Sequence, residues 1–367
     1  MKALKKFLIT LISLVLIFAI GFIGYLELSF YRIGDCEIAI GNNQTDMVAI
    51  GEIYTIATYN IGFGAYDREY SFFMDKGYMA DGSETVGKYG KGVSYDSVMK
   101  NTKGSIELLK EIDTDFMILQ EVDTESTRSY KINQRDMILE AFSTHSYTYA
   151  ENFHSAFLPY PLHDMHGIAN SGILTTSRFN MAYSYRYELP IDESFFNKFF
   201  DLDRCINLVR YDIKGSDKQL AIFSVHLSAY DEGGVYRARQ IELLRTLMTA
   251  EYEKGNYVIV GGDFNHDIAE GGSDFPTEQL RPDWIQSLEG DEFGEHFKIV
   301  YDNIRPTCRD ADIPYEEGVT YSTIIDGFII SDNIELMNVR TVDHMLAADT
   351  SFLYSDHNPV MMWFYLK

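Results

Sequence analysis

Eight polar residues follow or lie beside apolar, strand-like stretches at widely separated points of this 367-residue chain. They are Asn60, Glu121, His226, Asp263, Asn265, Asp326, Asp356 and His357. Buried strands must pack apolar side chains, so polar residues at strand ends are free to converge on one rim of a sheet. Carboxylates, carboxamides and two histidines, with no cysteine among them, suit a hard cation such as Mg²⁺ and the chemistry of a phosphate ester.

The motifs that hold these residues form an ordered set. They are TYNI (58–61), LQEV (119–122), SGILTTSR (171–178), VHL (225–227), GGDFN (261–265), IDGF (325–328) and SDHNPV (355–360). Acids in the loops of an ordinary α/β domain are common singly but do not make such a series. The series resembles the endonuclease/exonuclease/phosphatase superfamily, in particular its DNase I-like and neutral sphingomyelinase-like members.

The resemblance implies a metal site and a substrate site. Glu121 would be the principal ligand of a Mg²⁺ ion, with Mn²⁺ as a substitute. Asn60 and Asp356 would lie beside the same ion or the scissile phosphate. Asn60, Asn265 and His226 would also contact the substrate.

The resemblance also implies a catalytic group of Asp263, Asn265, His226, His357 and Asp326. Asp263 would orient or deprotonate the attacking water, and His357, steered by Asp326, would donate to the phosphate as charge builds. A phosphodiester is already anionic, so attack needs a cation to neutralise charge and a base to prepare water. A histidine whose other nitrogen is held by a carboxylate keeps the right tautomer.

Two positions separate the subfamilies. His226 stands in Val-His-Leu, as in the DNase I-like and sphingomyelinase-like members. The exonuclease III and abasic-site branch usually lacks this histidine and tends to carry an acid two residues after the first Asn, where this chain has Gly62. Both features argue against an abasic-site repair enzyme.

Alternating strand-like and helical segments predict one α/β domain. Helical spacing is found over 95–112, 130–142 and 235–252. The resemblance implies a DNase I-like, four-layer sandwich in which two packed, mostly antiparallel β-sheets are flanked by helices. We expect the catalytic domain to cover 53–367.

Two long segments between these elements are rich in aromatic residues. Residues 62–94 hold many Gly, Tyr and Phe, and residues 152–170 hold three histidines whose spacing suits no compact zinc motif. Segments this long in a compact domain are usually functional or disordered. For 152–170, a substrate-facing loop and a folded surface loop are both open. Arg237 and Arg239 could meet substrate phosphate, with exposure to solvent as the alternative.

The N-terminus predicts a membrane anchor. Lys2, Lys5 and Lys6 precede the uncharged run 7–25, which is roughly 28 Å long as a helix, about one hydrocarbon core. We expect a signal-anchor transmembrane helix over 1–26 and a stem over 27–52. A cleaved signal peptide is the alternative, although no clear small-x-small site follows. Because basic residues stay cytoplasmic, the expected location is the cell membrane, single-pass, with the catalytic domain extracytoplasmic.

The net charge of the chain indicates which class of substrate it can bind. The chain carries 55 acids against 31 bases, for a net charge of −24. Non-specific nucleic-acid binding depends on Lys and Arg neutralising phosphates, so this balance disfavours long polyanions. Solubility alone is another reason for such acidity. Three cysteines, Cys36, Cys205 and Cys308, are too few for a disulfide framework, and Cys205 is expected to pack as a small apolar residue.

The sequence therefore predicts a membrane-anchored, metal-dependent phosphoric ester hydrolase. The expected substrate is a lipid head group or another small phosphoester rather than nucleic acid, and we expect a monomer. An extracellular DNase I-like endonuclease is the alternative. A non-catalytic binding domain that kept the fold is a third hypothesis.

Overall fold

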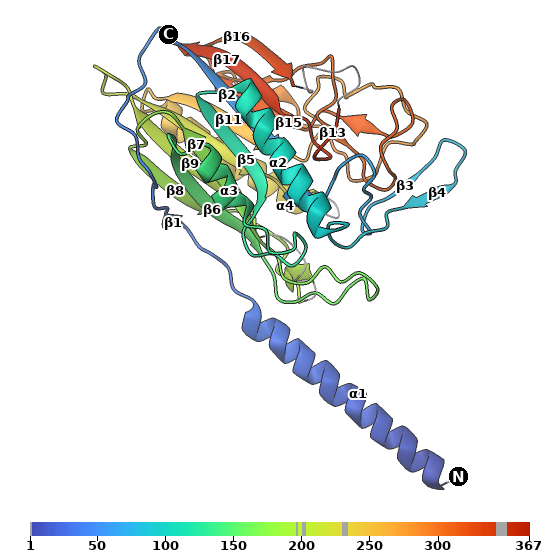
Figure 1. Ribbon diagram of the computed structural model, residues 1–367. Coiled ribbons are helices and arrows are strands. Elements are labelled where there is room, and N and C mark those ends of the chain that lie inside the picture. The colour runs from blue at the N-terminus through green and yellow to red at the C-terminus, as the bar shows by residue number, and fades with distance from the viewer. Residues whose placement is uncertain (1, 196, 200–202, 230–233, 343–350) are drawn as a thin grey trace.

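The computed structural model describes residues 2–195, 197–199, 203–229, 234–342 and 351–367. It consists of a long N-terminal helix and a body built on two large β-sheets (Figure 1). In order across the first sheet lie β1 (Cys36–Glu37), β8 (Tyr183–Glu188), β9 (Cys205–Asp212), β10 (Gln219–His226), β11 (Tyr257–Asp263), β15 (Asp326–Ser331) and β12 (Phe297–Val300). The second sheet has the order β16 (Ile334–Thr341), β17 (Val360–Leu366), β2 (Ile53–Asn60), β5 (Phe116–Asp123), β7 (Asn170–Ser177) and β6 (Ser146–His154).

Both sheets are mixed but mainly antiparallel. Among the described strands of the two large sheets, the pairs β10–β11 and β2–β5 are parallel. Two small ribbons add β3 (Lys76–Tyr78) with β4 (Glu84–Val86), and β13 (Cys308–Arg309) with β14 (Ser322–Thr323). Single 3₁₀ turns occupy Gly62–Gly64, Asn197–Phe199 and Gly290–Phe293.

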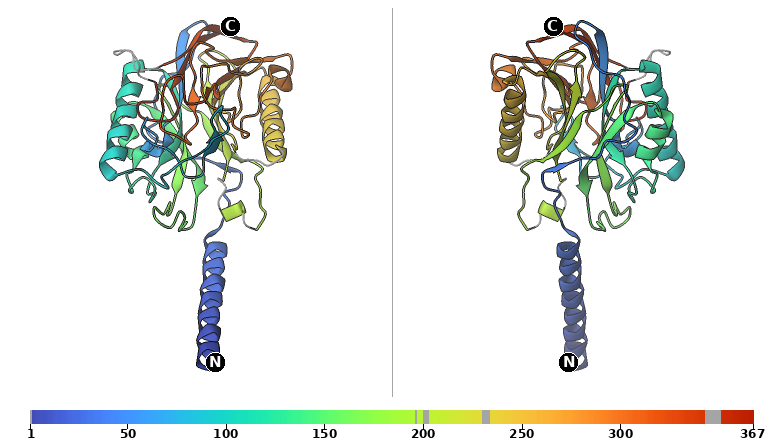
Figure 2. Two further views of the ribbon diagram at one scale, coloured as in Figure 1. Left: turned by 90° about the vertical axis from the view of Figure 1, so that its right-hand side faces the viewer. Right: turned by 90° about the vertical axis from the view of Figure 1, so that its left-hand side faces the viewer.

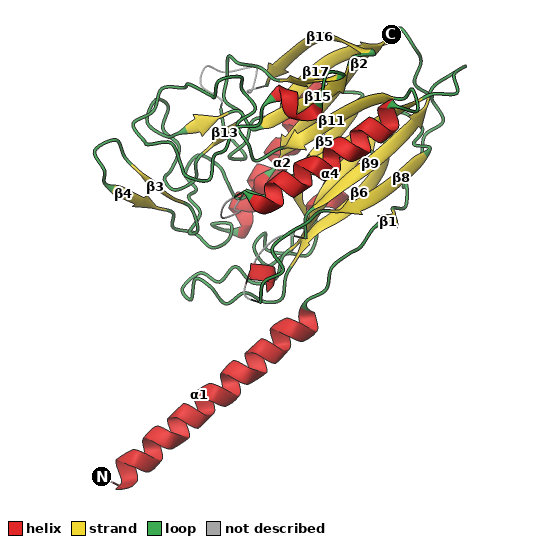
Figure 3. Cartoon of the chain, turned by 180° about the vertical axis from the view of Figure 1, so that it is seen from behind, coloured by secondary structure: helices red, strands yellow, loops and turns green. Residues whose placement is uncertain are grey.

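Helices cover the outer faces of the two sheets. Helices α2 (Tyr95–Ile112) and α3 (Gln134–Ala141) pack on the second sheet, and α4 (Val235–Tyr252) packs on the first (Figures 2 and 3). The largest apolar core lies between the sheets, and two further cores lie beneath α4 and beneath α2 and α3. This order of helix, sheet, sheet and helix confirms the four-layer, DNase I-like sandwich.

The sequence pattern explains most of these elements. All seven residues of β11 are buried, because this strand has packed layers on both faces. Helices α2 and α4 have the expected bounds, and Ser94 caps α2 by accepting a hydrogen bond from the Ser97 amide. Helix α3 begins at Gln134 rather than at residue 130, because Tyr130 and Lys131 have positive φ angles.

The N-terminal helix α1 (Lys2–Ser29) projects from the body and buries only Leu26. By length and composition it could cross a membrane. The segment 27–52, expected to be a stem, joins the body over part of its length: β1 pairs with β8, and Val48 is fully buried in the core between the sheets. The boundaries at 26 and 52 remain predictions.

A close approach between β10 and β11 depends on glycine. Gly262 has a φ of 151°, and a Cβ there would collide with the carbonyl oxygen of Val225 on β10. The preceding Gly261 faces Ile118 of the second sheet and Phe328 of β15, which a Cβ would crowd. These glycines let three strands and the opposite sheet converge directly before Asp263.

We therefore expect Gly262→Ala to destabilise the fold by about 3 kcal/mol or more, since backbone atoms would have to move. Gly290→Ala is the matched control, because a Cβ at Gly290 meets no atom within 4 Å. Thermal unfolding of the two variants measures the difference. Equal melting temperatures would contradict the close approach.

Candidate active site

A row of polar side chains crosses three adjacent strands of the first sheet. The register aligns His226 of β10 with Asp263 of β11, and Asp263 with Asp326 of β15. His226 Nε2 lies 3.5 Å from Asp263 Oδ2, and Asp326 Oδ2 lies 2.8 Å from His357 Nδ1. His357 Nε2 turns back to within 3.7 Å of Asp263 Oδ2. We call these four residues the polar row.

The second sheet meets the polar row through Asn60, the last residue of β2. The Asn60 amide nitrogen lies 3.1 Å from Asp263 Oδ2 and 3.2 Å from Glu121 Oε1, and can donate to both. Its side-chain oxygen accepts the Gly62 amide, which fixes the orientation of the carboxamide. Asn60 thus ties both sheets and two carboxylates together at one point.

A β-bulge turns Glu121 toward Asn60. The pairing of β5 with β7 shifts register between Leu119 and Val122, and Glu121 has a φ of 53°. A positive φ is uncommon for glutamate and marks a backbone held by its surroundings. Bulges re-aim side chains next to active sites. As a result, the Glu121 side chain lies beside the polar row and is 21% exposed.

Asp356 provides a second carboxylate near Glu121. Ser355 holds this turn to β2 by donating to the carbonyl oxygen of Asn60 at 2.7 Å. Burial, reinforced by the charge of Glu121, raises the pKa of Asp356 to about 6. The carboxylates of Glu121 and Asp356, with the amide oxygen of Asn60, form a set of oxygen ligands, and a divalent cation there would favour the charged form of Asp356. The residues therefore fit a Mg²⁺ or Mn²⁺ ion.

A second carboxylate cluster offers a rival metal position. Ligand atoms of Asp263, Asp326 and His357 all lie within 4.8 Å of one another. However, the carboxylates of Asp326 and Asp263 overcome the effect of burial and raise the pKa of His357 well above its ordinary value. His357 Nδ1 already contacts Asp326 Oδ2 at 2.8 Å, so one ring nitrogen and one carboxylate oxygen are engaged with each other. We therefore interpret this trio as a hydrogen-bonded group.

The two histidines have opposite electrostatics. Burial, helped by the charge of Arg204, lowers the pKa of His226 well below its ordinary value. His357 is held charged, as described above. Burial and the charge of Asp326 raise the pKa of Asp263 to about 6, although His357 acts to lower it. The site thus combines a neutral imidazole, an imidazolium and a carboxylate that can take up a proton near neutral pH.

Asn265 lies in the turn after β11 with a φ of 49°. Asparagine tolerates this left-handed conformation better than most residues. Its backbone amide donates to Asp263 Oδ1 at 2.9 Å, and its side-chain nitrogen donates to the carbonyl oxygen of Leu227 at 2.7 Å. Because a carboxamide carries two N–H donors, one remains for a substrate oxygen.

These residues surround one cavity of about 720 Å³. Seven of the eight residues selected from the sequence line it, and the eighth, Asp326, lies behind His357. Aromatic and apolar side chains from the two long segments form much of its wall. They are Tyr66, Phe72, Phe73 and Met74 from 62–94, and Phe153, Leu158 and Tyr160 from 152–170. Both segments therefore face the cavity.

Sequence reasoning missed three arginines that line the cavity, Arg128, Arg204 and Arg309. Arg128 makes two hydrogen bonds to Asp123, at 2.8 and 3.1 Å, and its guanidinium lies 3.8 Å from Glu121 Oε2. It also stacks over the ring of Phe63 at 3.9 Å. A cation so placed can attract an anionic substrate.

The alternative that Arg237 is exposed to solvent is wrong. The side chain is buried, and its Nη1 donates to the carbonyl oxygens of Ala229 and Trp284. It therefore braces the chain around α4 instead of meeting solvent. Arg239 is exposed and lies over the ring of Tyr236.

Cys36 is exposed, and Cys205 and Cys308 are buried and free. All three cysteines are free in the structure. Cys205 is fully buried within the core between the sheets, which confirms its role as a packed apolar residue.

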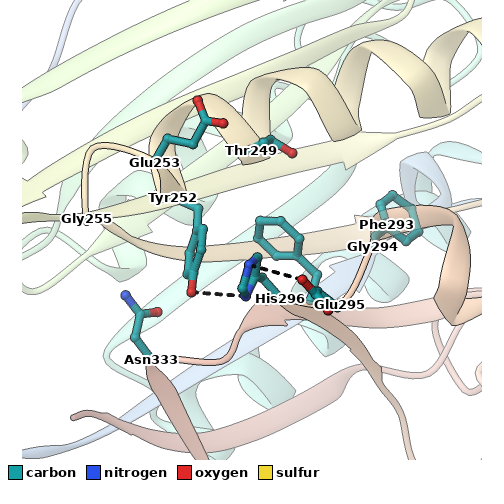
Figure 4. Close-up of a pocket in the computed structure, with 10 residues that line it drawn as sticks. Thr249, Tyr252, Glu253, Gly255, Phe293, Gly294, Glu295, His296 and Asn333 are labelled. Carbon is teal, nitrogen blue, oxygen red and sulfur yellow. Dashed lines mark hydrogen bonds and ion pairs between the residues drawn. The ribbon is translucent and has the colours of Figure 1, made fainter.

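A second hollow, of about 530 Å³, lies at the other end of β11 (Figure 4). It is lined by the end of α4 and by residues 293–297, where the rings of Tyr252 and His296 stack at 4.7 Å. His296 Nδ1 contacts the exposed carboxylate of Asp332 at 2.9 Å. The exposed pair of His296 and Asp332 is therefore separate from the polar row.

The two histidines should differ in a direct titration. In protein stripped of metal with EDTA, we expect His226 to remain neutral and His357 to remain protonated at pH 7, as read from ¹⁵N–¹H correlations of labelled histidine. Asp326→Asn removes the largest charge that stabilises the imidazolium, so the pKa of His357 should fall. A neutral His357 at pH 7 in the unsubstituted protein would contradict the assignment.

The sequence profile of the Endonuclease/Exonuclease/phosphatase family matches residues 57–357. No curated protein matches the chain. An endonuclease/exonuclease/phosphatase from Beutenbergia cavernae is similar over 86% of this chain and 72% of its own, at 14% identity and a TM-score of 0.51.

TDP2 from C. elegans is similar over 87% of this chain and 76% of its own, at 16% identity and a TM-score of 0.52. TDP2 from D. rerio, in complex with a single-strand DNA product, is similar over 85% and 99%, at 12% identity and a TM-score of 0.51. At these identities the structures share the fold. The match of the family profile, with the motifs gathered at one cavity, shows that this chain belongs to the endonuclease/exonuclease/phosphatase family.

Proposed function

We propose that this protein is a divalent-metal-dependent hydrolase of phosphate esters. The observation that carries the proposal is the polar row, in which Asp263 lies between two histidines and beside Asn60. This arrangement supplies a base and hydrogen-bond donors around one position. Membership of a family of phosphoester hydrolases supports the same reaction.

Glu121, Asp356 and Asn60 would hold Mg²⁺ or Mn²⁺, which neutralises negative charge on the phosphate when bound. Asp263 accepts the proton of the attacking water, a task that suits a carboxylate whose pKa is about 6. The imidazolium of His357, oriented by Asp326, donates to a phosphate oxygen as charge grows. Water's oxygen bonds to phosphorus, the P–O bond to the leaving oxygen breaks, and that oxygen takes up a proton from solvent to leave as the alcohol, while Asp263 returns its proton to solvent.

Two further residues hold the substrate in this scheme. Neutral His226 lies beside Asp263 and contributes one ring N–H to the phosphate or to the leaving oxygen. Asn265 contributes its second amide hydrogen. Arg128 adds a fixed positive charge near Glu121, which favours the anionic substrate without acting as a base.

The proposed substrate is a lipid head group or another small phosphoester. The cavity wall is rich in aromatic side chains, and the net charge of −24 opposes association with a long polyanion. The helix α1 would anchor the protein in the cell membrane as a single pass, with the lysines at its N-terminal end cytoplasmic and the body extracytoplasmic. Residues 1–26, 27–52 and 53–367 are the proposed anchor, connecting segment and catalytic domain.

Cleavage of DNA is a second candidate. The fold likeness to TDP2 bound to a single-strand DNA product favours this reading. The two candidates differ in the leaving group and in the length of the polyanion that must reach the cavity. Both candidate reactions would use the same metal ion, the same base and the same two histidines.

The test is a panel of substrates presented to the full-length protein in lipid nanodiscs with Mg²⁺. We expect hydrolysis of sphingomyelin, a phosphoinositide or the soluble diester bis(p-nitrophenyl) phosphate to exceed cleavage of single-stranded and plasmid DNA at matched concentration. Efficient DNA cleavage without lipid or small-diester turnover would move the assignment to a nuclease.

The same assay tests the metal. Excess EDTA should abolish turnover, and added Mg²⁺ or Mn²⁺ should restore it. Glu121→Gln keeps the shape of the side chain but removes the charge, so we expect folded protein with turnover lowered at least about a hundredfold. Full activity in EDTA would refute metal dependence.

The polar row makes a separate prediction. His226→Ala and His357→Ala should each lower kcat at least about a hundredfold, with little change in melting temperature, because each removes a preorganised donor. Asp326→Asn should cost less than His357→Ala, since it disturbs the imidazole without removing it. The double variant of Asp326 and His357 should be far from additive. If either histidine only packs the core, its loss would lower stability and spare the activity of the folded fraction.

A further inference from the structure

We propose that an apolar loop surface beside α1 rests on the outer leaflet of the membrane and presents the cavity mouth to lipid. The surface, which we call the apolar tip, consists of Phe157, Tyr160, Leu162, Met165 and Ile168, with Phe195 nearby. The partner that binds this surface is a bilayer of zwitterionic phospholipids. The inference deepens the proposed function and rests on it for the nature of the substrate.

The apolar tip is exposed to an unusual degree. Leu162 is 75% exposed and Tyr160 63% exposed, and the other residues of the tip are each at least 36% exposed. Single exposed apolar residues are normal, but five within 157–168 on one loop mark an interaction surface. The loop is ordered by its own hydrogen bonds, including the pair between Leu158 and Gly167.

The tip lies at the end of the candidate membrane helix. The Phe157 amide donates to the Tyr25 hydroxyl at 2.9 Å, and Lys198 forms an ion pair with Glu27 at 2.9 Å. The ring of Tyr31 stacks on His154 at 3.7 Å. Figures 1 and 2 show the segments after β6 and β8 beside the end of α1 that enters the body.

These contacts fix the height of the tip relative to a bilayer. The uncharged run of α1 ends at Tyr25, and Glu27 is the first acid after it, so the membrane surface lies at this level. Tyrosine is enriched at this interface. Residues of neighbouring loops that contact Tyr25 and Glu27 must then lie close to the same interface.

The tip is also part of the cavity wall. Tyr160 and Leu158 line the cavity, and the Tyr160 ring contacts Phe73 on the opposite segment at 5.4 Å between centroids. Tyr160 is therefore part of both the apolar tip and the cavity wall. A phosphoester at the bilayer surface can enter between these rings and travel toward the polar row without leaving the interface.

Charge near the tip favours a zwitterionic surface over an anionic one. Lys198 is already paired with Glu27, and Lys91 lies 3.5 Å from Asp164. The chain as a whole carries 55 acids and 31 bases. Contact with the bilayer would therefore depend on apolar burial and change little with salt.

The first experiment measures how deeply the apolar tip enters the membrane, and it does not depend on enzymatic activity. A nitroxide is attached at Leu162→Cys in full-length protein carrying Cys36→Ser, in phosphatidylcholine nanodiscs. We expect the nitroxide to collide more often with dissolved oxygen than with a water-soluble nickel chelate, which is the behaviour of a label located in the membrane interface. The control is Met337→Cys on β16, which is exposed and lies at the end of the body away from α1 (Figure 1). A Leu162 label as water-accessible as the Met337 label would overturn the proposal.

The second experiment links the tip to substrate delivery. Leu162 and Met165 do not line the cavity, so the double variant Leu162→Glu, Met165→Glu should leave hydrolysis of bis(p-nitrophenyl) phosphate unchanged. Hydrolysis of the lipid substrate in the same nanodiscs should fall at least about tenfold. The matched control is Met337→Glu with Ile53→Glu, two exposed apolar residues elsewhere, which should change neither rate.

The outcomes separate the two proposals. If the unsubstituted protein cleaves no phosphoester, the proposed function fails, while the nitroxide still decides whether the tip contacts membrane. If the protein cleaves lipid and the double variant cleaves it equally well, the delivery role of the tip is overturned. Equal loss of soluble-diester and lipid turnover would likewise overturn it, since it would reveal damage to the cavity.

Discussion

The buried carboxylate of Asp263 is the constraint on which the site depends. One oxygen accepts the Asn60 amide from the opposite sheet, and the other accepts the backbone amide of Asn265. Taking a carboxylate out of water is costly unless hydrogen bonds compensate. The end of β2, the end of β11 and the turn after it must therefore all be in place around this group. The bonds that join the ends of β2 and β11 therefore also position the candidate base.

The site retains features that a fold selected only for stability would not keep. Glu121 and Asn265 both have positive φ angles, which are costly for residues other than glycine. Burial raises the pKa of Asp263 and of Asp356, so each charge is held against its own desolvation. Strained backbone and carboxylates with raised pKa values gather at functional sites. A cation near Glu121 would favour the charged form of Asp356.

The sequence could predict the strand-end residues because apolar runs identify buried strands and polar residues directly after them share a rim. It could not predict the bulge that turns Glu121, since a bulge depends on the pairing of β5 with β7. Arg128 was missed because it stands in a loop and reaches the site through its bond to Asp123. The two-residue strand β1 was also missed, since so short a strand has no periodicity.

The position of the bound metal ion distinguishes the two candidate ligand clusters. We propose that Glu121, Asp356 and Asn60 bind the cation while the polar row stays free to move protons. A crystal of the protein grown with Mn²⁺, with diffraction measured at the manganese absorption edge, gives the position of the ion. We predict one anomalous peak within coordinating distance of the Glu121 carboxylate. A peak among Asp263, Asp326 and His357 instead would contradict the account, because the imidazole and carboxylates assigned to proton transfer would then be ligands.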